Sequence, residues 1–136
     1  MSKPLFQKEI FVPSTAEGLN ECIDIASEIG KLFDFDYNLS FALQTVLVES
    51  IENAFIHGNK SIRDLEVRVF ILVNKSEIFV EVEDKGEGFD LNAIPSPVEG
   101  TNIFNESGRG LFFIKNFSSS CYTVGKGNII RIKIDR

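Results

Sequence analysis

Glu49 and Asn53 lie in a stretch rich in apolar residues, VLVESIENAFIHGN, which runs from Val46 to Asn59. Glu49 and Asn53 are four positions apart, so a helix would place them on one side, one turn from each other. Apolar residues flank them, and a helix that is apolar on nearly all sides is usually buried. Burying an unpaired carboxylate is costly. The pair therefore indicates either a mutually satisfied structural contact or a ligand site.

Two glycine motifs follow this stretch. Asp84-x-Gly86-x-Gly88-Phe89 comes directly after a predicted strand, and Gly108-Arg109-Gly110-Leu111 opens a predicted helix. Taken alone, the first motif could be a turn that leaves a strand. The second is weak alone; its chemical use would be anion binding. Free backbone N–H groups and the helix dipole converge at a helix start, and glycine permits close approach there.

The elements that must position these motifs can be predicted from periodicity and breaker residues. They are a strand over 5–12, a helix from 16 to about 29, a helix from 38 to 57, a hairpin of strands 67–73 and 78–83, an aperiodic loop over 90–107, a short helix over 111–117, and strands over 121–124 and 129–134. Strands and helices segregate along the chain, which favours an α+β fold. We expect one domain over residues 1–136, a two-layer sandwich with a mixed sheet and helices on one face.

Finer expectations concern the helix ends and faces. Ser14 should cap the first helix, with Glu17 three residues later as a capping box. Asp36 or Asn38 should cap the second, and Gly58 suits a left-handed position at its end. The core-facing residues are expected to be Leu19, Ile23, Ala26 and Ile29 or Gly30 in the first helix, and Leu43, Leu47, Ile51, Ala54 and Phe55 in the second.

Composition excludes several functions. A net charge of −6 argues against binding a nucleic acid backbone, which needs a basic face. Cys22 and Cys121 are far apart and the chain has one His, so a zinc site is not expected. No apolar run approaches the ~20 residues of a membrane helix. The N-terminal MSKPLFQKEIF lacks the apolar core of a signal peptide, which predicts a cytoplasmic protein.

The three motifs, taken together and in this order, resemble the N box, G1 box and G2 box of the Bergerat-fold (GHKL-type) ATPases. These include gyrase, heat-shock chaperones, sensor histidine kinases and mismatch-repair ATPases. The matches are Glu49-x-x-x-Asn53-Ala54-x-x-His57-Gly58, Asp84-x-Gly86-x-Gly88-Phe89 and Gly108-x-Gly110-Leu111. The chain is most similar to the anti-sigma-factor serine/threonine protein kinases. It has no room for a transducer domain and no dimerisation helix pair with a phosphoacceptor His.

The resemblance implies that ATP and Mg²⁺ are the cofactors. Asp84 would accept a hydrogen bond from the adenine amino group, Gly86 would let the backbone approach the base, and Gly88 would begin the ATP lid, about residues 90–107. The backbone of the G2 motif, with Leu111 at its end, would hold the phosphates, and Arg109 could add a charged contact or point to solvent.

The resemblance also assigns the N-box residues. Asn53 would be a ligand of Mg²⁺, which prefers hard oxygen ligands. Glu49 would be the catalytic residue and would orient a serine hydroxyl or a water, or accept its proton. His57 is expected to cap or pack the helix rather than contact the nucleotide.

The implied function is phosphorylation of an anti-sigma-factor antagonist with Mg-ATP, and the chain could also hold a sigma factor. The alternative is a non-catalytic, ATP-dependent protein-binding switch. It is motivated by two departures from the family pattern: Thr15–Lys31 contains no Arg, and the residues before the G2 box are Asn105-Glu106-Ser107. A structural protein without nucleotide is a third interpretation. An edge-like first strand and the family together suggest a homodimer.

Overall fold

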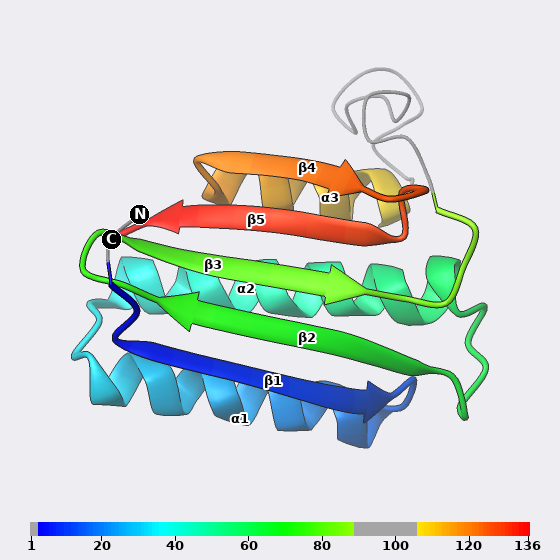
Figure 1. The fold of residues 1–136 in the computed structure, drawn as a ribbon, viewed down its shortest axis with the longest axis horizontal. Helices are drawn as coiled ribbons and strands as arrows, with labels where there is room; N and C mark the ends of the chain where they lie inside the picture. The colour runs from blue at the N-terminus through cyan, green and yellow to red at the C-terminus, as the bar shows by residue number, and fades with distance from the viewer. Residues whose placement is uncertain (1–2, 89–105) are drawn as a thin grey trace.

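Five strands form one sheet in the order β1-β2-β3-β5-β4, and the helices lie on one of its faces (Figure 1). The computed structural model describes residues 3–88 and 106–136, and the side chains of these residues except 106–109. The elements are β1 (Phe6–Pro13), α1 (Ala16–Leu32), α2 (Tyr37–Asn53), the π-helical turn η1 (Ala54–Gly58), β2 (Glu66–Val73), β3 (Glu77–Glu83), α3 (Glu106–Phe117), β4 (Ser120–Val124) and β5 (Ile129–Asp135). The predicted α+β sandwich is confirmed.

The sheet is antiparallel throughout its described strands, and the expectation of a mixed sheet was wrong. The helix pair α1–α2 explains the pairing of β1 with β2. A single crossover helix would make neighbouring strands parallel, whereas two successive helices return the chain to the end of the sheet that it left. β4 runs in the same direction as β3, but β5 lies between them and is antiparallel to both.

Helix α2 lies in the middle of the helical layer, between α1 and α3 (Figure 1). The five apolar residues that were expected to share its inner face are all buried: Leu43, Leu47, Ile51, Ala54 and Phe55. Ala42 and Val46 are buried too, because α2 contacts both neighbouring helices as well as the sheet. Ile56, which was expected to flank the polar pair, is instead 49% exposed.

The segment Tyr37–Gly58 is long and apolar enough to pass for a membrane-spanning helix by length and composition. Core helices commonly meet the same criterion, so the composition alone is weak evidence for a membrane span. The position of α2 against the sheet, α1 and α3 accounts for its apolar residues.

Helix α1 differs from its prediction at the start and in its buried side. Thr15, not Ser14, is the N-cap, and its side chain accepts a hydrogen bond from the Gly18 N–H at 3.2 Å. Ser14 is buried and donates to the Leu65 carbonyl at 2.6 Å. A Cβ on Gly18 would lie 2.2 Å from the Pro13 oxygen, and this close approach sets the rotation of the helix. The buried residues of α1 are therefore Gly18, Cys22, Ile25, Ala26 and Ile29, whereas Leu19 and Ile23 are only partly buried.

The remaining predictions for helix ends and hairpins are mostly confirmed. Asp36 caps α2 by accepting the Leu39 N–H at 2.8 Å. The β2–β3 hairpin has the predicted strands, and Ile130, Ile132 and Ile134 face the core from β5. Helix α1 continues past Gly30 to Leu32.

The core position of α2 can be tested with two aliphatic truncations on one helical segment. Leu47→Ala should lower the free energy of unfolding by about 2–5 kcal/mol, because Leu47 is fully buried. Ile56→Ala should cost less than about 1 kcal/mol, because that side chain is half exposed. Urea unfolding followed by circular dichroism measures both. Equal losses would mean that α2 is not the centre of the core.

Candidate functional site

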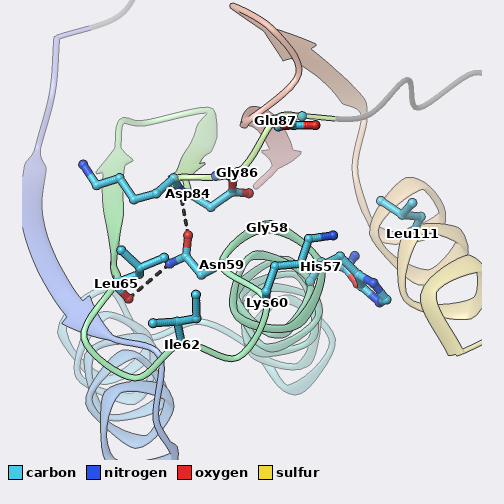
Figure 2. A pocket seen from close by; sticks show the side chains of 13 residues that line it. His57, Gly58, Asn59, Lys60, Ile62, Leu65, Asp84, Gly86, Glu87 and Leu111 are labelled. Atoms are coloured by element: carbon cyan, nitrogen blue, oxygen red, sulfur yellow. Dashed lines mark hydrogen bonds between the residues drawn. The ribbon is translucent and has the colours of Figure 1, made fainter.

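A cavity of about 590 Å³ opens where η1, the loop after it, the end of β3 and α3 come together (Figure 2). This volume lies within the range of small-molecule sites. Leu65 and Leu111 lie on opposite sides of the cavity in Figure 2. The described residues that line it are Asn53, His57, Gly58, Asn59, Lys60, Ile62, Leu65, Asp84, Lys85, Gly86, Glu87, Gly88 and Leu111.

Asp84 places a buried carboxylate at the cavity, directly after β3. Its Oδ1 accepts the Gly86 N–H at 2.7 Å. Its backbone is held by Asn128: the Asp84 N–H donates to the Asn128 carbonyl, and the Asn128 side-chain amide donates to the Asp84 carbonyl, both at 3.0 Å. Burial raises the pKa of the Asp84 carboxyl, and the Gly86 hydrogen bond opposes that rise. The Asp84 carboxylate is therefore a poorly solvated acceptor that is held in one orientation.

Gly58 and Gly86 allow the chain to close tightly around this carboxylate. A Cβ on Gly58 would lie 2.2 Å from the Asp84 Cγ, and a Cβ on Gly86 would lie 2.4 Å from the Gly58 carbonyl oxygen. The expectation that Gly58 is left-handed was wrong, because its φ is not positive. Glycine is needed at position 58 for close approach and not for backbone conformation.

Gly88 does require a glycine conformation. Its φ is +91°, and a Cβ there would lie 1.9 Å from the Lys126 carbonyl oxygen. Gly88 therefore lies directly against the β4–β5 turn. Side chains are excluded at this point by both conformation and space.

The two N-box residues both lie close to Gly110, but only Asn53 is among the described residues that line the cavity. Asn53 is the last residue of α2 and lines the cavity. Its Nδ2 is buried and has no hydrogen-bond partner among the described residues. Glu49 is not among the described lining residues; its Oε2 lies 2.8 Å from where a Cβ on Gly110 would be. The Asn53 amide atoms are 3.6 and 3.7 Å from that same point, so Gly110 brings α3 against both N-box side chains.

Helix α3 begins earlier than the sequence predicted. It starts at Glu106, so Gly108 and Gly110 lie inside its first turns and not before them. Only the first four N–H groups of a helix lack an internal acceptor, and the N–H of Gly108 is among these four whereas that of Gly110 is the fifth. The phosphate contact of this motif stays a prediction. Leu111 is 4% exposed and lines the cavity. The Arg109 side chain, and the predicted lid up to residue 105, lie outside the described residues.

Two residues at the end of η1 complete the site. His57, which was expected to cap or pack the helix, lies in the last turn of η1, and its exposed side chain lines the cavity. Asn59 was given no role, although it is 0% exposed and makes several side-chain hydrogen bonds. The sequence shows only an Asn directly after Gly58, and its burial and hydrogen bonds become visible only in the structure.

The cysteines have no part in this site. Burial raises the pKa of the Cys22 thiol to about 12 and that of Cys121 to about 11, so both stay protonated at neutral pH. Within residues 3–88 and 106–136, no group of three or more His, Cys, Asp or Glu residues could hold a metal ion.

The contact between Gly58 and Asp84 gives a direct test. Gly58→Ala should destabilise the protein by about 1–3 kcal/mol through overpacking, although alanine favours helices over glycine. Adding Asp84→Ala should restore much of this loss, because it removes the atoms that the new Cβ would meet. Gly30→Ala, whose Cβ would lie 3.1 Å from the Ser40 Oγ, is the control. If Asp84→Ala gives no rescue in chemical unfolding, this contact is not the constraint at position 58.

The site can now be compared with known proteins. The sequence model described as histidine kinase-like ATPase domain matches residues 12–134. The serine-protein kinase RsbW of Oceanobacillus iheyensis is 26% identical over 113 residues, which cover 79% of this chain and 72% of that protein. The family match spans nearly all the described elements and the whole candidate site. The chain therefore belongs to the histidine kinase-like ATPase domain family.

Proposed function

We propose that this protein binds ATP with Mg²⁺ and transfers the γ-phosphoryl group to a serine or threonine of a partner protein. The observation that carries the proposal is the buried Asp84 carboxylate in a cavity of about 590 Å³. The family match and the similarity to a serine-protein kinase support it.

Asp84 and the glycines around it suit the adenine end of a nucleotide. An ionised carboxylate only accepts hydrogen bonds, so it would favour the amino group of adenine over the carbonyl that guanine presents. Gly86 leaves room for a flat base close to the backbone. Ile62, Leu65 and Leu111 supply apolar surface to the cavity walls.

Asn53 suits the phosphate end. Its buried amide has a polar atom without a protein partner among the described residues. A half-turn of the amide would exchange nitrogen for oxygen, and oxygen is the ligand that Mg²⁺ prefers. A bound Mg²⁺ would neutralise charge on the phosphate oxygens. The first turns of α3 contain Gly108 and Gly110, and Gly110 lies next to Asn53. The free backbone N–H groups at this helix start would donate hydrogen bonds to the phosphates.

Glu49 is the residue that we assign to catalysis. As the serine oxygen forms a bond to the γ-phosphorus, the bond from that phosphorus to the bridging oxygen breaks and ADP leaves. The proton of the serine hydroxyl passes to the Glu49 carboxylate. Glu49 is one turn from Asn53, and its Oε2 lies close to Gly110 in the first turns of α3.

We infer the partner class from the same relationship. The substrate would be an anti-sigma-factor antagonist, and a sigma factor could be a second partner. The absence of Arg from Thr15–Lys31 favours a second candidate function, an ATP-dependent switch without transfer. Its partner surface would differ from that of kinases which use an Arg in this helix.

Asp84→Asn tests the proposed hydrogen bond from the adenine amino group to the negatively charged Asp84 carboxylate. ATP affinity, measured by calorimetry, should fall by about tenfold or more. The exposed Asp64 offers a matched control, and Asp64→Asn should leave the affinity unchanged.

The same variant has a signed pH dependence. Because the folded protein holds the Asp84 proton more tightly than the unfolded chain does, this residue lowers stability as pH rises from the ordinary carboxyl pKa through the raised value. Asp84→Asn should therefore unfold at a higher temperature than the parent at pH 7, with a smaller difference at low pH. A lower melting temperature at pH 7 would contradict the direction of the shift.

Glu49→Gln separates the two candidate functions. Transfer of labelled phosphate from ATP to a purified anti-sigma-factor antagonist should fall by about 10²–10⁴-fold. ATP affinity should change less than about threefold, because Glu49 is not among the described residues that line the cavity. Asn53→Ala should instead weaken Mg²⁺-dependent ATP binding, and Glu52→Gln on the same helix is the control. ATP binding by the parent without any transfer would favour the switch.

A further inference from the structure

We propose that Asn59 is a positioning residue that holds Asp84 in place and thereby sets the base selectivity of the cavity. This inference rests on the proposed nucleotide binding at the same site. Asn59 is 0% exposed and directly follows η1. Figure 2 shows it between Leu65 and the segment that begins at Asp84.

The Asn59 side chain joins both walls of the cavity. Its Oδ1 accepts the Lys85 N–H at 2.7 Å, which fixes the peptide that follows Asp84. Its Nδ2 lies 3.1 Å from the Ser14 Oγ, 3.1 Å from the Leu65 carbonyl and 3.3 Å from the Glu66 carbonyl. One amide therefore connects the segments after β1, before β2 and after β3, of which the last two line the cavity.

The wall that Asn59 holds is conformationally strained. The next two residues, Lys60 and Ser61, have φ values of +56° and +59°. Residues other than glycine rarely adopt this left-handed backbone conformation. Such strain persists only where the surroundings over-determine the backbone, and it is common at ligand sites. The Asn59 carbonyl accepts the Ile62 N–H at 3.0 Å, so this residue closes the strained turn with its backbone as well.

The hydrogen bond from the Lys85 N–H to Asn59 restrains Asp84 through the peptide bond that joins Asp84 to Lys85. Asp84 is already enclosed by Gly58 on one side and bonded to the Gly86 N–H on the other. The Asn128 side-chain amide holds the carbonyl end of the Asp84–Lys85 peptide, and Asn59 holds its N–H end. Without the Asn59 contact this peptide would keep only the Asn128 hydrogen bond, so the direction of the carboxylate would be less well fixed. A carboxylate with a variable direction would discriminate poorly between an amino group and a carbonyl on a purine.

Asn74 provides a matched control for a purely structural role. It is also 0% exposed, and its Oδ1 also accepts backbone N–H groups, those of Ser76 and Glu77 at 2.9 and 2.8 Å. It lies in the β2–β3 turn, at the opposite end of the sheet from Asp84 (Figure 1). Truncating it should disturb a turn without disturbing the cavity.

The experiment compares Asn59→Ala with Asn74→Ala in the full chain, at a temperature where both are folded. Asn59→Ala should weaken ATP binding by about tenfold, the equivalent of about one hydrogen bond. It should also reduce the ratio of ATP to GTP affinity by about the same factor. Asn74→Ala should change both quantities less than about twofold while losing comparable stability. An unchanged ATP-to-GTP ratio in folded Asn59→Ala would overturn the proposal.

A double-mutant cycle tests whether Asn59 acts through Asp84. In an Asp84→Asn background, Asn59→Ala should have little further effect on the ATP-to-GTP ratio, because coupled residues are not additive. Full additivity would overturn the proposed route. Failure of the unmodified protein to bind ATP would instead count against the proposed function.

Hydrogen exchange gives a measurement without any variant. The Lys85 amide lies outside the strands, yet it should be protected from exchange in the nucleotide-free protein because of Asn59. The neighbouring Glu87 amide is the internal comparison. Exchange of Lys85 at the rate of an open loop would contradict the inference even if Asn59→Ala fails to fold.

Discussion

The close contact between Gly58 and the Asp84 carboxylate is the constraint on which the site depends. A side chain at position 58 would overlap that carboxylate, and a side chain at 86 would overlap the Gly58 carbonyl. The backbone of Gly58, at the end of η1, can therefore touch the side chain of Asp84, which directly follows β3. The cavity lies beside this contact. Two of its walls come from segments 26 residues apart, which are joined by the hydrogen bond from the Lys85 N–H to Asn59.

Costly features gather around this contact. Asp84 is a buried carboxylate whose pKa is raised, Asn53 has a buried amide nitrogen without a described partner, and Lys60 and Ser61 have left-handed backbones. Each lowers stability in the absence of a ligand. The apolar packing of α2 against the sheet and both neighbouring helices supplies the rigidity that holds them. Most of these features lie at one cavity, although the buried amide nitrogen of Asn74 in the β2–β3 turn also lacks a described partner and Asp34 also has a left-handed backbone.

The π-helical turn η1 links the core to the site. Through Asn53 the chain follows a regular helix whose inner residues are buried. From Ala54 to Gly58 it widens, and π-turns of this kind are frequent at functional sites. Ala54 and Phe55 still pack into the core, while His57 and Gly58 reach the cavity. A strictly α-helical register would direct these four residues differently.

The sequence by itself determined the elements, their order and the three motifs, because hydrophobic period and glycine placement are local properties. The motif residues Asn53, Asp84, Gly86, Gly88 and Leu111 line one cavity, and their role there stays a prediction. Only the tertiary structure decided that the sheet is antiparallel, that Thr15 caps α1 and that α3 starts at Glu106. It also decided that Glu49 lies against Gly110, that Gly58 is needed for space, and that Asn59 joins the two cavity walls. Except for the Thr15 cap, which contacts Gly18 three residues on, these features depend on how segments distant in the chain pack, and no local pattern encodes such packing.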